Sequence, residues 1–556
     1  MEQGIPQPPT GKLRFEEWEE LRLKRLEAFD RDVPRSQRLT VLAGLACATG
    51  IEIAGRTATG FLLPDMQGNA GATLDELSWV MIAYNTGYIC SLGVSAGIVR
   101  SFGIRKLWLT CLFLYGVGTL LTFFSHELAP LLIARAIAGL GGGIFIVRSV
   151  LFLRELFPKK EVPMAITMFN VILFSIKGLW PVVMGALSDA GSWNDAFLTE
   201  IPFVALSFFI VWKFLPARAP SVSRLPPADY LGVGLLLSGL ISCQVALNRG
   251  EREMWFQASW ISFLLIFSAI CFAFFIWWDS REGNENPILH IRNILSQHTY
   301  TAAFGLVLLC GAFMGAGLYV IPQYLRIIQS YNAQQTSVFY LVDTIGLLTG
   351  VSVAVWIGVP RFGGAKTAAL GSLLFGACMA AFVFSWTDQT PGSYIGWLLL
   401  LHGTGVGLLL AGTSLLSTGS LDRRFQNEAA TSYFFLRQLG ASLGVTAAAV
   451  LIDQRMTVHS SRILDAANRL NPAVQTTLRD FAAVIAARGD GTSVPNPGNY
   501  EIFRGLVVTQ ARLLAFIDIC FCLAVGAAFF LIVLAVARWR QLHVVSDPRL
   551  SMIVGR

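Results

Sequence analysis

Long apolar segments alternate with short polar ones along almost the whole chain. After a polar stretch over residues 1–38, apolar runs of roughly 20 residues follow one another at close intervals, which is the length that a helix needs to cross a bilayer. The pattern therefore predicts about fourteen membrane-spanning helices. They are placed near residues 39–63, 77–98, 105–124, 130–152, 163–187, 201–216, 229–248, 257–278, 300–325, 336–358, 367–386, 393–417, 429–452 and 508–537.

The composition supports a membrane protein and excludes two other classes. Of the 556 residues, 54% are hydrophobic and only 14% are charged, whereas a soluble domain is roughly 25% charged. A soluble chain of this length would also expose far more polar surface. We therefore exclude a soluble enzyme and an extended disordered protein, and we predict an all-α polytopic membrane protein with the lipid bilayer as its main partner.

The basic residues indicate the orientation of the helices, not binding to nucleic acid. The net charge of +7 would suggest nucleic acid only if Lys and Arg formed a stripe on one folded face. They lie instead in short segments between apolar runs, where such residues favour the cytoplasmic side. Because the number of spans is even, both termini are predicted to be cytoplasmic. The basic residues of the inner segments beyond residue 38 include Arg105, Lys106, Arg154, Lys159, Lys160, Arg218, Arg224, Arg281, Arg292, Arg361, Lys366, Arg423, Arg424, Arg538 and Arg540.

The alternate loops carry acidic residues, as expected of outer loops. Arg249 and Arg252 are exceptions, and so is the long segment 455–506, which has several arginines. Long loops obey the charge rule less strictly. The acids assigned to outer loops are Asp65, Asp75, Glu76, Glu127, Asp189, Asp195 and Glu200.

Two polar segments have the pattern of amphipathic helices. Arg14–Arg31 in the N-terminal tail is expected to lie at the membrane surface or in solvent. Val474–Arg488 lies within the outer segment 455–506 and is followed by a turn-rich stretch, GDGTSVPNPGN. No binding motif occurs in this outer segment, so we predict a simple lid on the outer face.

We single out six ionisable side chains within the predicted spans, because an ionisable group at the bilayer centre costs roughly 2.5–3.5 kcal/mol and therefore suggests a function. Glu52 and Arg56 lie four residues apart on one helix face. They either neutralise each other, or Glu52 takes up and releases a proton while Arg56 tunes it or meets the cargo. Asp343 either pairs with a base from another helix or carries the proton itself.

The other three of these six side chains are all basic. Arg135 lies in the fourth span and is predicted to have a functional role. Arg148, nearer the inner end of the same span, is as readily explained by extension to the lipid headgroups. Lys177 lies four residues before Pro181, where a helix distortion is expected, and it either contacts cargo or a gate or forms a buried structural pair. Because bases outnumber acids, the cavity could favour an anionic or zwitterionic cargo.

Small and aromatic residues within the spans have simpler interpretations. Gly139 and Gly143, and likewise Gly440 and Gly444, are spaced to let another helix approach closely. We favour packing over a hinge for both pairs. Trp180 is the aromatic residue that we expect at the cargo cavity.

The histidine and cysteine residues do not predict a metal site. His402 is the one histidine within a span, and a hydrogen-bonded core group is favoured over a proton relay. The nine cysteines lie in apolar segments without metal-binding spacing. We therefore expect no metal and no cofactor.

A short sequence recurs at two corresponding turns. SFGIRK (101–106) follows the second span and RFGGAK (361–366) follows the tenth. Each is a basic inner turn between apolar helices, which suggests two related bundles, a layout common among secondary transporters with a midplane site between the halves.

Four phrases of the sequence have counterparts in a known family. They are AGIVRSFGIRK (96–106), ARAIAGLGGG (134–143), LWPVVMG (179–185) and RQLGASLG (437–444). The first three resemble the loop signature GxLxDRxGRR, the fourth-span pattern RxxxGxGxG and the fifth-span pattern GPxxGG of the major facilitator superfamily, and RQLGASLG is similar to a recurrent phrase of its fourteen-span drug:proton antiporter branch. Arg135 takes the place of the family's fourth-span arginine.

The chain departs from the family pattern at several positions. The loop acid is replaced by Arg100, and by Pro360 in the second copy. The first glycine of the fifth-span pattern is replaced by Trp180, and the acid expected in the first span is replaced by Gly55. The resemblance therefore implies a divergent member of the branch.

The resemblance implies a layout for the chain and a gate at its inner turns. The gate would comprise Arg100, Gly103, Arg105, Arg361 and Gly363. The predicted units are a cytoplasmic tail at 1–38, a six-helix bundle at 39–217, two linker helices at 228–278, a second six-helix bundle at 295–540 that includes the outer loop 455–506, and a cytoplasmic tail at 541–556.

The resemblance also implies proton-coupled efflux of small amphipathic drugs or metabolites across the plasma membrane, which is the inner membrane in a Gram-negative cell. Glu52 and Asp343 are the candidates for proton coupling, with a periplasmic adaptor protein as a partner by family analogy. A dedicated exporter or importer of one anionic or zwitterionic metabolite remains the alternative. No GxxxxGK[ST] or HExxH sequence occurs, so an ATP-driven pump, a membrane enzyme or a sensor is less favoured.

Overall fold

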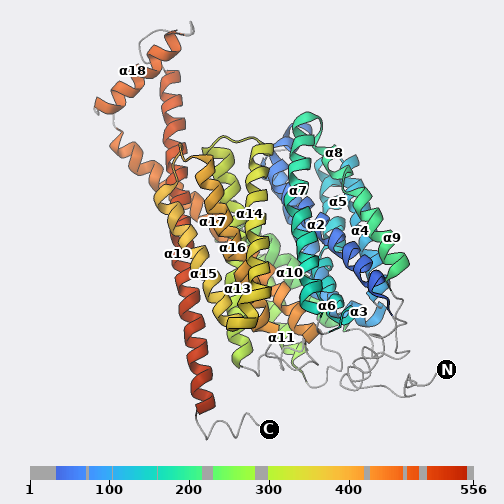
Figure 1. Cartoon of the computed structure of the whole chain (residues 1–556). Coiled ribbons are helices and arrows are strands. Elements are labelled where there is room, and N and C mark those ends of the chain that lie inside the picture. Colours follow the sequence, from blue (N-terminus) through green and yellow to red (C-terminus); the bar gives the residue numbers. More distant parts are fainter. Residues whose placement is uncertain are drawn as a thin grey trace, which may run out of the picture.

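The computed structural model is a bundle of long helices that run side by side (Figure 1). It describes residues 33–70, 74–102, 104–158, 161–215, 229–281, 298–418, 426–467, 472–487 and 497–546. No strand occurs within these ranges, so the prediction of an all-helical fold is confirmed. The predicted tail helix at Arg14–Arg31 lies outside the described residues.

The first eight described helices form one half of the bundle. They are α2 (Arg35–Ala70), α3 (Leu74–Phe102), α4 (Ile104–Phe124), α5 (Leu128–Gly142), α6 (Phe145–Leu156), α7 (Val162–Ala190), α8 (Trp193–Leu198) and α9 (Ile201–Phe214). α2 packs against α7 and α9, and α5 packs against α3 and α4. At their centre the rings of Trp108 and Phe145 stack with centroids 5.0 Å apart, so the core of this half is an apolar cluster that is closed to solvent.

The helices after residue 297 form the other half. They are α13 (His298–Gln323), α14 (Ala333–Val353), α15 (Val359–Ser385), α16 (Gly392–Thr418), α17 (Gln426–Ala466), α18 (Pro472–Ala487) and α19 (Pro497–Ser546). α13 packs on α17, and α16 packs on α14 and α15. This half has its own apolar core, in which Phe313 stacks on Phe375 with ring centroids 5.2 Å apart.

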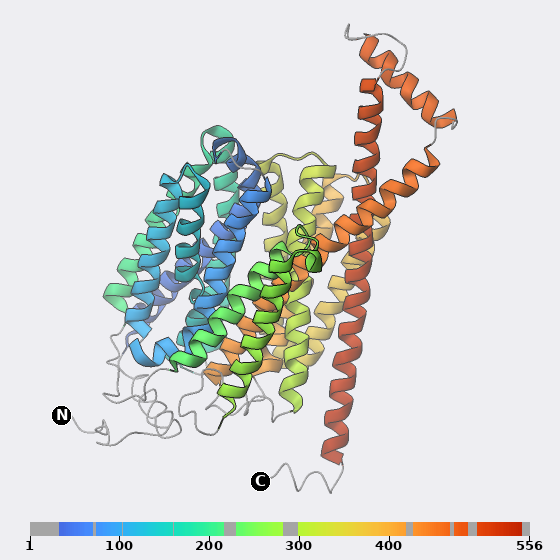
Figure 2. The ribbon, with the colours of Figure 1, turned by 180° about the vertical axis from the view of Figure 1, so that it is seen from behind.

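Two further helices, α10 (Tyr230–Arg249) and α11 (Ser259–Asp279), connect the halves. They pack on each other, and α10 also packs on α3 and α17, so both slant across the back of the bundle (Figure 2). Ser442 of α17 donates a hydrogen bond to Oε1 of Gln244 on α10, at 3.1 Å. Through α10, the linker pair therefore contacts both halves on one side.

Several helices depart from regular α-helical geometry, two of them at or near a proline or a glycine. π-helical turns occur at Tyr324–Ile328, just after Pro322, and at Ala354–Gly358. Gly363 has φ of +79°, a left-handed value that side chains disfavour. Gly363, in the second repeated turn, is thus required for the bend within α15 (Val359–Ser385).

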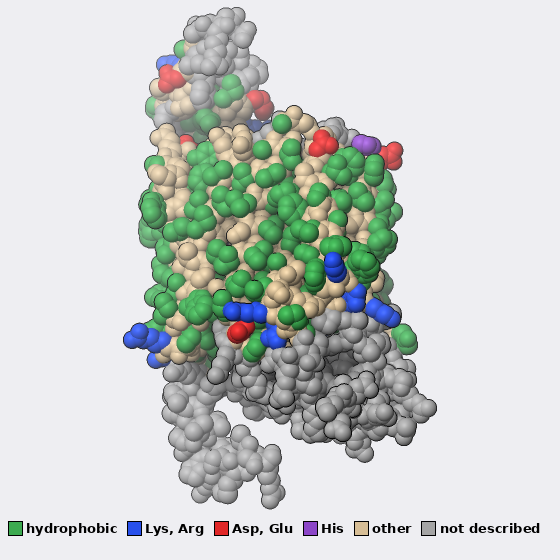
Figure 3. Space-filling model, turned by 45° about the vertical axis from the view of Figure 1, so that its right-hand side comes forward, with side chains coloured by type: hydrophobic (Ala, Val, Ile, Leu, Met, Phe, Trp, Pro, Cys, Tyr) green, Lys and Arg blue, Asp and Glu red, His purple; other side chains and the backbone are tan. Residues whose placement is uncertain are grey.

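The outer surface of the bundle fits a bilayer. Twelve stretches of the described residues are long and apolar enough to cross a membrane, and large apolar side chains such as Phe263, Phe274 and Trp277 on α11 are more than half exposed. Figure 3 shows apolar side chains over the middle of one face, with Lys and Arg gathered at one end. The protein is therefore a multi-pass membrane protein.

Two expectations from the sequence are wrong in the described parts. Residues 455–506 were expected to form a lid, but α17 and α19 continue as helices beyond the bundle and carry α18 away from it (Figures 1 and 2). Glu200 was assigned to an outer loop, but its side chain is fully buried within the first half. The short helix α8 precedes α9 and brings residue 200 inside.

Close helix contacts at glycine provide the first prediction. A β-carbon at Gly440 would collide with the backbone carbonyl oxygen of Leu308 on α13, whereas the space around Gly396 on α16 is open. Gly440→Ala is expected to destabilise the protein by about 1–3 kcal/mol through overpacking. Gly396→Ala is expected to be neutral or to stabilise, since Ala is the better helix former by about 1 kcal/mol. Thermal unfolding in detergent measures both, and equal Tm values would contradict the close α13–α17 contact.

Candidate functional site

Glu52 lies fully buried at the middle of α2, surrounded by polar groups from two helices. The Tyr84 hydroxyl on α3 donates a hydrogen bond to its Oε1 at 2.7 Å, and Nε of Arg56 lies 3.5 Å from the same oxygen. Gly142 on α5 leaves room for this group, since a β-carbon there would lie 2.7 Å from Cγ of Glu52. The predicted Glu52–Arg56 pair is therefore formed, with a tyrosine as a third member.

Arg135 of α5 is the most deeply buried cation of this half, with 1% of its surface exposed. It donates a hydrogen bond to the Thr59 hydroxyl of α2. Its guanidinium lies 4.8 Å from the ring centre of Tyr84 and 5.0 Å from that of Phe197, and aromatic faces attract cations at such distances. Arg135 thus joins α2, α3 and α8.

A second buried carboxyl, Glu200, was missed as a site residue. It is fully buried at the start of α9 and accepts a hydrogen bond from the Tyr115 hydroxyl at 2.8 Å. The charges of Arg135 and Glu52 both act on it. The sequence held one signal: the predicted span at 201–216 was short for a bilayer, and extending it back to Trp193 would have included Glu200.

Arg56 connects this group to the other half of the protein. Its Nη1 lies 3.4 Å from Oε1 of Gln438 on α17, and its guanidinium lies 4.6 Å from the ring centre of Tyr88. About a fifth of its side-chain surface is exposed, against none for Glu52. Arg56 is therefore the member of the set that reaches the junction between the halves.

The halves also meet through α7 and α14. A β-carbon at Gly178 would lie 3.0 Å from Cδ1 of Leu341 and 3.2 Å from Cβ of Thr344. Lys177, the next residue, is partly buried and lies within electrostatic reach of both Asp343 and Arg56. Lys177 is thus a basic group placed between an acid of one half and a base of the other.

Arg148 of α6 is buried, with 4% of its surface exposed. It donates to the Ser95 hydroxyl at 2.9 Å and reaches the Thr431 hydroxyl of α17 at 3.5 Å. The interpretation that it extends to the lipid headgroups is therefore wrong, and Arg148 is a second polar link between the halves.

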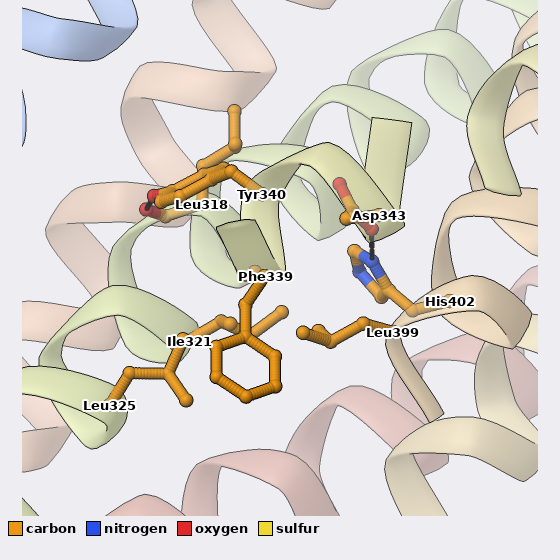
Figure 4. Close-up of a pocket in the computed structure, with 9 residues that line it drawn as sticks. Leu318, Ile321, Leu325, Phe339, Tyr340, Asp343, Leu399 and His402 are labelled. Atoms are coloured by element: carbon orange, nitrogen blue, oxygen red, sulfur yellow. Dashed lines mark hydrogen bonds and ion pairs between the residues drawn. The ribbon is translucent and has the colours of Figure 1, made fainter. Parts of the chain in front are cut away.

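Asp343 and His402 form a pair in the other half. Nδ1 of His402 lies 2.7 Å from Oδ1 of Asp343, and Figure 4 shows them facing each other from α14 and α16. The rest of the pocket beside them is mainly apolar. Its other lining residues are Gly317, Leu318, Ile321, Leu325, Phe339, Tyr340 and Leu399. An acid with a histidine partner therefore lines an apolar pocket.

The remaining predicted site residues are more scattered. Trp180 packs against Phe203 of its own half, with ring centroids 4.6 Å apart, and Pro181 lies within the continuous helix α7. Arg105 donates to the Trp212 carbonyl, and Arg361 is exposed near the Phe362 ring. The side chain of Arg100 and all of Gly103 lie outside the described residues.

Each of the glycines predicted to pack helices lies against the backbone of a neighbouring helix. A β-carbon at Gly139 or Gly143 would collide with a carbonyl oxygen of α3, and one at Gly444 with a carbonyl oxygen of α13. At these contacts the two helices are so close that only the hydrogen atom of a glycine side chain fits between them, and a β-carbon does not.

The buried charged groups of the two halves are chemically able to exchange protons with their surroundings. No group of three or more His, Cys, Asp or Glu residues that could hold a metal occurs in the described part of the chain. Carboxyls buried beside guanidinium and tyrosine groups can instead bind or release a proton as the surrounding charges move.

The model of the Major Facilitator Superfamily matches residues 45–445, which is well over half of the chain. The chain belongs to the major facilitator superfamily. The prediction made from its four phrases is therefore confirmed, and superfamily membership makes it a membrane transporter.

Among curated relatives of this superfamily member is the probable multidrug resistance protein EmrY of Escherichia coli, 25% identical over 79% of this chain and 84% of the relative. The multidrug export protein EmrB of the same species is 23% identical over 79% and 85%. The fatty acid resistance protein FarB of Neisseria gonorrhoeae is 24% identical over 84% and 91%. Such low identities fit a divergent member.

Solved structures of the superfamily share the fold. A bacterial homologue of the human lysosomal transporter Spinster, in an inward-facing and unoccupied conformation, has a TM-score of 0.55 at 12% identity, covering 90% of this chain and 98% of its own. The peptide transporter PepTSo has a TM-score of 0.54 at 12% identity, covering 90% and 99%.

The α7–α14 contact can be tested by cross-linking. Gly178→Cys combined with Thr344→Cys is expected to form a disulfide on mild oxidation, because the β-carbons lie close to the separation of about 3.8 Å that a disulfide needs. A protease site inserted within residues 216–228 lets gel electrophoresis report whether the halves stay joined. Each single-cysteine variant is the control for the native cysteines. Halves that separate after oxidation of the double variant would contradict the contact.

Proposed function

We propose that the protein is a proton-coupled exporter of small amphipathic compounds that works by alternating access. The observation that carries this proposal is the buried set of Glu52, Arg56 and Arg135, which touches the other half through Gln438. Movement of one half against the other would change the surroundings of Arg56, and hence the charge balance at Glu52. The names of the relatives, multidrug export and multidrug resistance, support a drug-like cargo.

The proposed layout has fourteen crossings with both termini in the cytoplasm. It counts α14 and α15 separately within the stretch Gln334–Ser385 and adds α3. The two bundles are residues 39–217 and 295–540, with linkers at 228–278 and tails at 1–38 and 541–556. The start of α2 and the end of α19 lie at the same end of the bundle (Figure 1). The protein would reside in the plasma membrane and act without enzymatic chemistry. An adaptor protein is its proposed partner.

The exceptional Arg249 is consistent with this orientation. Its guanidinium forms an ion pair with Glu253 at 2.8 Å and lies 5.1 Å from the ring centre of Trp79. The orienting bias is counted from Lys and Arg over all the short loops together, so one turn with basic residues does not reverse it. The arginine therefore does not argue against an outer position for this turn.

Asp343 is the proposed proton-binding group of the second half. It has one oxygen 2.7 Å from His402 and lies at a pocket, with Lys177 of the first half within electrostatic reach. A base that approaches from across the junction would favour the ionised acid. Lys177 would in this way couple closure of the halves to release of the proton.

Transport driven by a pH gradient in everted membrane vesicles tests these roles. Glu52→Gln, Asp343→Asn and Arg135→Ala are each expected to lower the initial rate by about tenfold or more, since an intramembrane charge is rarely dispensable. Glu127→Gln changes an exposed acid and is expected to transport normally. If all three site variants match the native rate, the assignment of these residues fails.

A second candidate is a dedicated exporter or importer of one anionic or zwitterionic metabolite. Lys177 at the junction favours it, as does the name of the relative FarB, a fatty acid resistance protein. Lys177 could pair directly with an anionic group that enters between the halves.

The charge of the cargo separates the two candidates. Everted vesicles are expected to accumulate a fluorescent cationic dye when a pH gradient is applied, because a cation and a proton can compete for Glu52 or Asp343. A fluorescent organic anion is tested in parallel, and Lys177→Met serves as the matched variant. Uptake of the anion alone, lost in Lys177→Met, would replace the first candidate by the second.

A further inference from the structure

Glu200 differs from an ordinary structural acid in one respect: half of its carboxyl group is unsatisfied. Oε2 accepts the hydrogen bond from Tyr115, but Oε1 is buried without a hydrogen-bond partner. Thr119 lies beside the same carboxyl, and its hydroxyl is the further side-chain donor that acts on it. A fully buried carboxylate with a free oxygen is costly, and binding a proton at that oxygen removes most of the cost.

The position of Glu200 is matched by a gap on α2. A β-carbon at Gly55 would lie 2.9 Å from Cδ of Glu200 and would collide with Oε1. Gly55 lies between Glu52 and Thr59 along α2, so the carboxyl from the start of α9 occupies the space of a side chain on the helix that carries Glu52. Two acids from different helices thus enter one site.

The charges around Glu200 come from every helix packed on it. Arg135 of α5 attracts the carboxylate, Glu52 of α2 repels it, and the Tyr115 hydroxyl of α4 donates to it. Tyr84 of α3 lies on the other side, bonded to Glu52. With Arg56 beside Glu52, the two acids are balanced by two bases.

We propose that Glu200 is a second proton-binding carboxyl of the first half, coupled to Glu52 through Arg135. When cargo or movement of the halves draws Arg56 toward Gln438 and away from Glu52, Arg135 alone must neutralise two carboxylates. Their mutual repulsion then favours uptake of a proton by one of them, and each has a buried oxygen without a hydrogen-bond partner, Oε2 in Glu52 and Oε1 in Glu200. This inference rests on the proposed proton-coupled transport and adds to it a residue that supplies the proton site from α9.

The test compares transport driven by a pH gradient with cargo exchange at equal pH, in vesicles containing the full chain. Glu200→Gln is expected to lose about tenfold or more of gradient-driven transport while exchange stays within about twofold. Asp195→Asn, an exposed acid on the neighbouring α8, is the matched control and should leave both rates unchanged.

If Glu200→Gln disturbs folding, moving the carboxyl from residue 200 to residue 55 provides a second test. Glu200→Ala is expected to lose gradient-driven transport, and Glu200→Ala with Gly55→Asp is expected to regain it, because the new carboxyl extends from α2 into the same space. Gradient-driven transport by folded Glu200→Gln at the native rate would overturn the inference, as would a swap that fails to recover. If the native chain itself shows no dependence on the pH gradient, the proposed function fails instead.

Discussion

Charge buried in an apolar bundle must be neutralised where it stands, and the first half of this protein is arranged around that requirement. Glu52 has a tyrosine and an arginine on one oxygen, and Arg135 lies between two aromatic rings and a threonine. The glycines at positions 55 and 142 leave the space that the two carboxyl groups fill. Helix spacing, small residues and ring positions here follow from accommodating a few charges.

Inclusion of Glu200 changes the charge balance read from the sequence. Counting the residues within the predicted spans gives an excess of bases, which pointed toward an anionic cargo. In the structure, the cluster of the first half has two acids, Glu52 and Glu200, and two bases, Arg56 and Arg135. Two further bases of the first half, Arg148 and Lys177, lie at its contacts with the second half.

The all-helical fold and the superfamily were predictable because apolar periodicity and the four phrases are local properties of the chain. The site was only partly predictable. Glu52 and Arg56 are one helical turn apart, so spacing alone pairs them, but Asp343 and His402 are 59 residues apart and meet only through packing of α14 on α16. Glu200 was missed because the predicted span began at residue 201, whereas the apolar helical stretch begins at Trp193. The protrusion of α17 and α19 was missed because apolar content predicts only the part of a helix that lies in the membrane. A helix can continue into water with polar residues, as these two do.

The length of the protruding helices of the second half would amplify any tilting movement at their ends. α19 is a single helix of 50 residues, so it is about 75 Å long. Asp518 of α19 pairs with two residues of α17: His459, whose Nε2 lies 2.8 Å from Oδ2, and Arg455, whose Nε lies 3.1 Å from the same oxygen. A rigid rod of this length that tilts by about 10° around its middle moves each tip by about 6 Å. A small rocking of the helices within the bilayer would thereby move α18, outside the bilayer, sideways by about 6 Å.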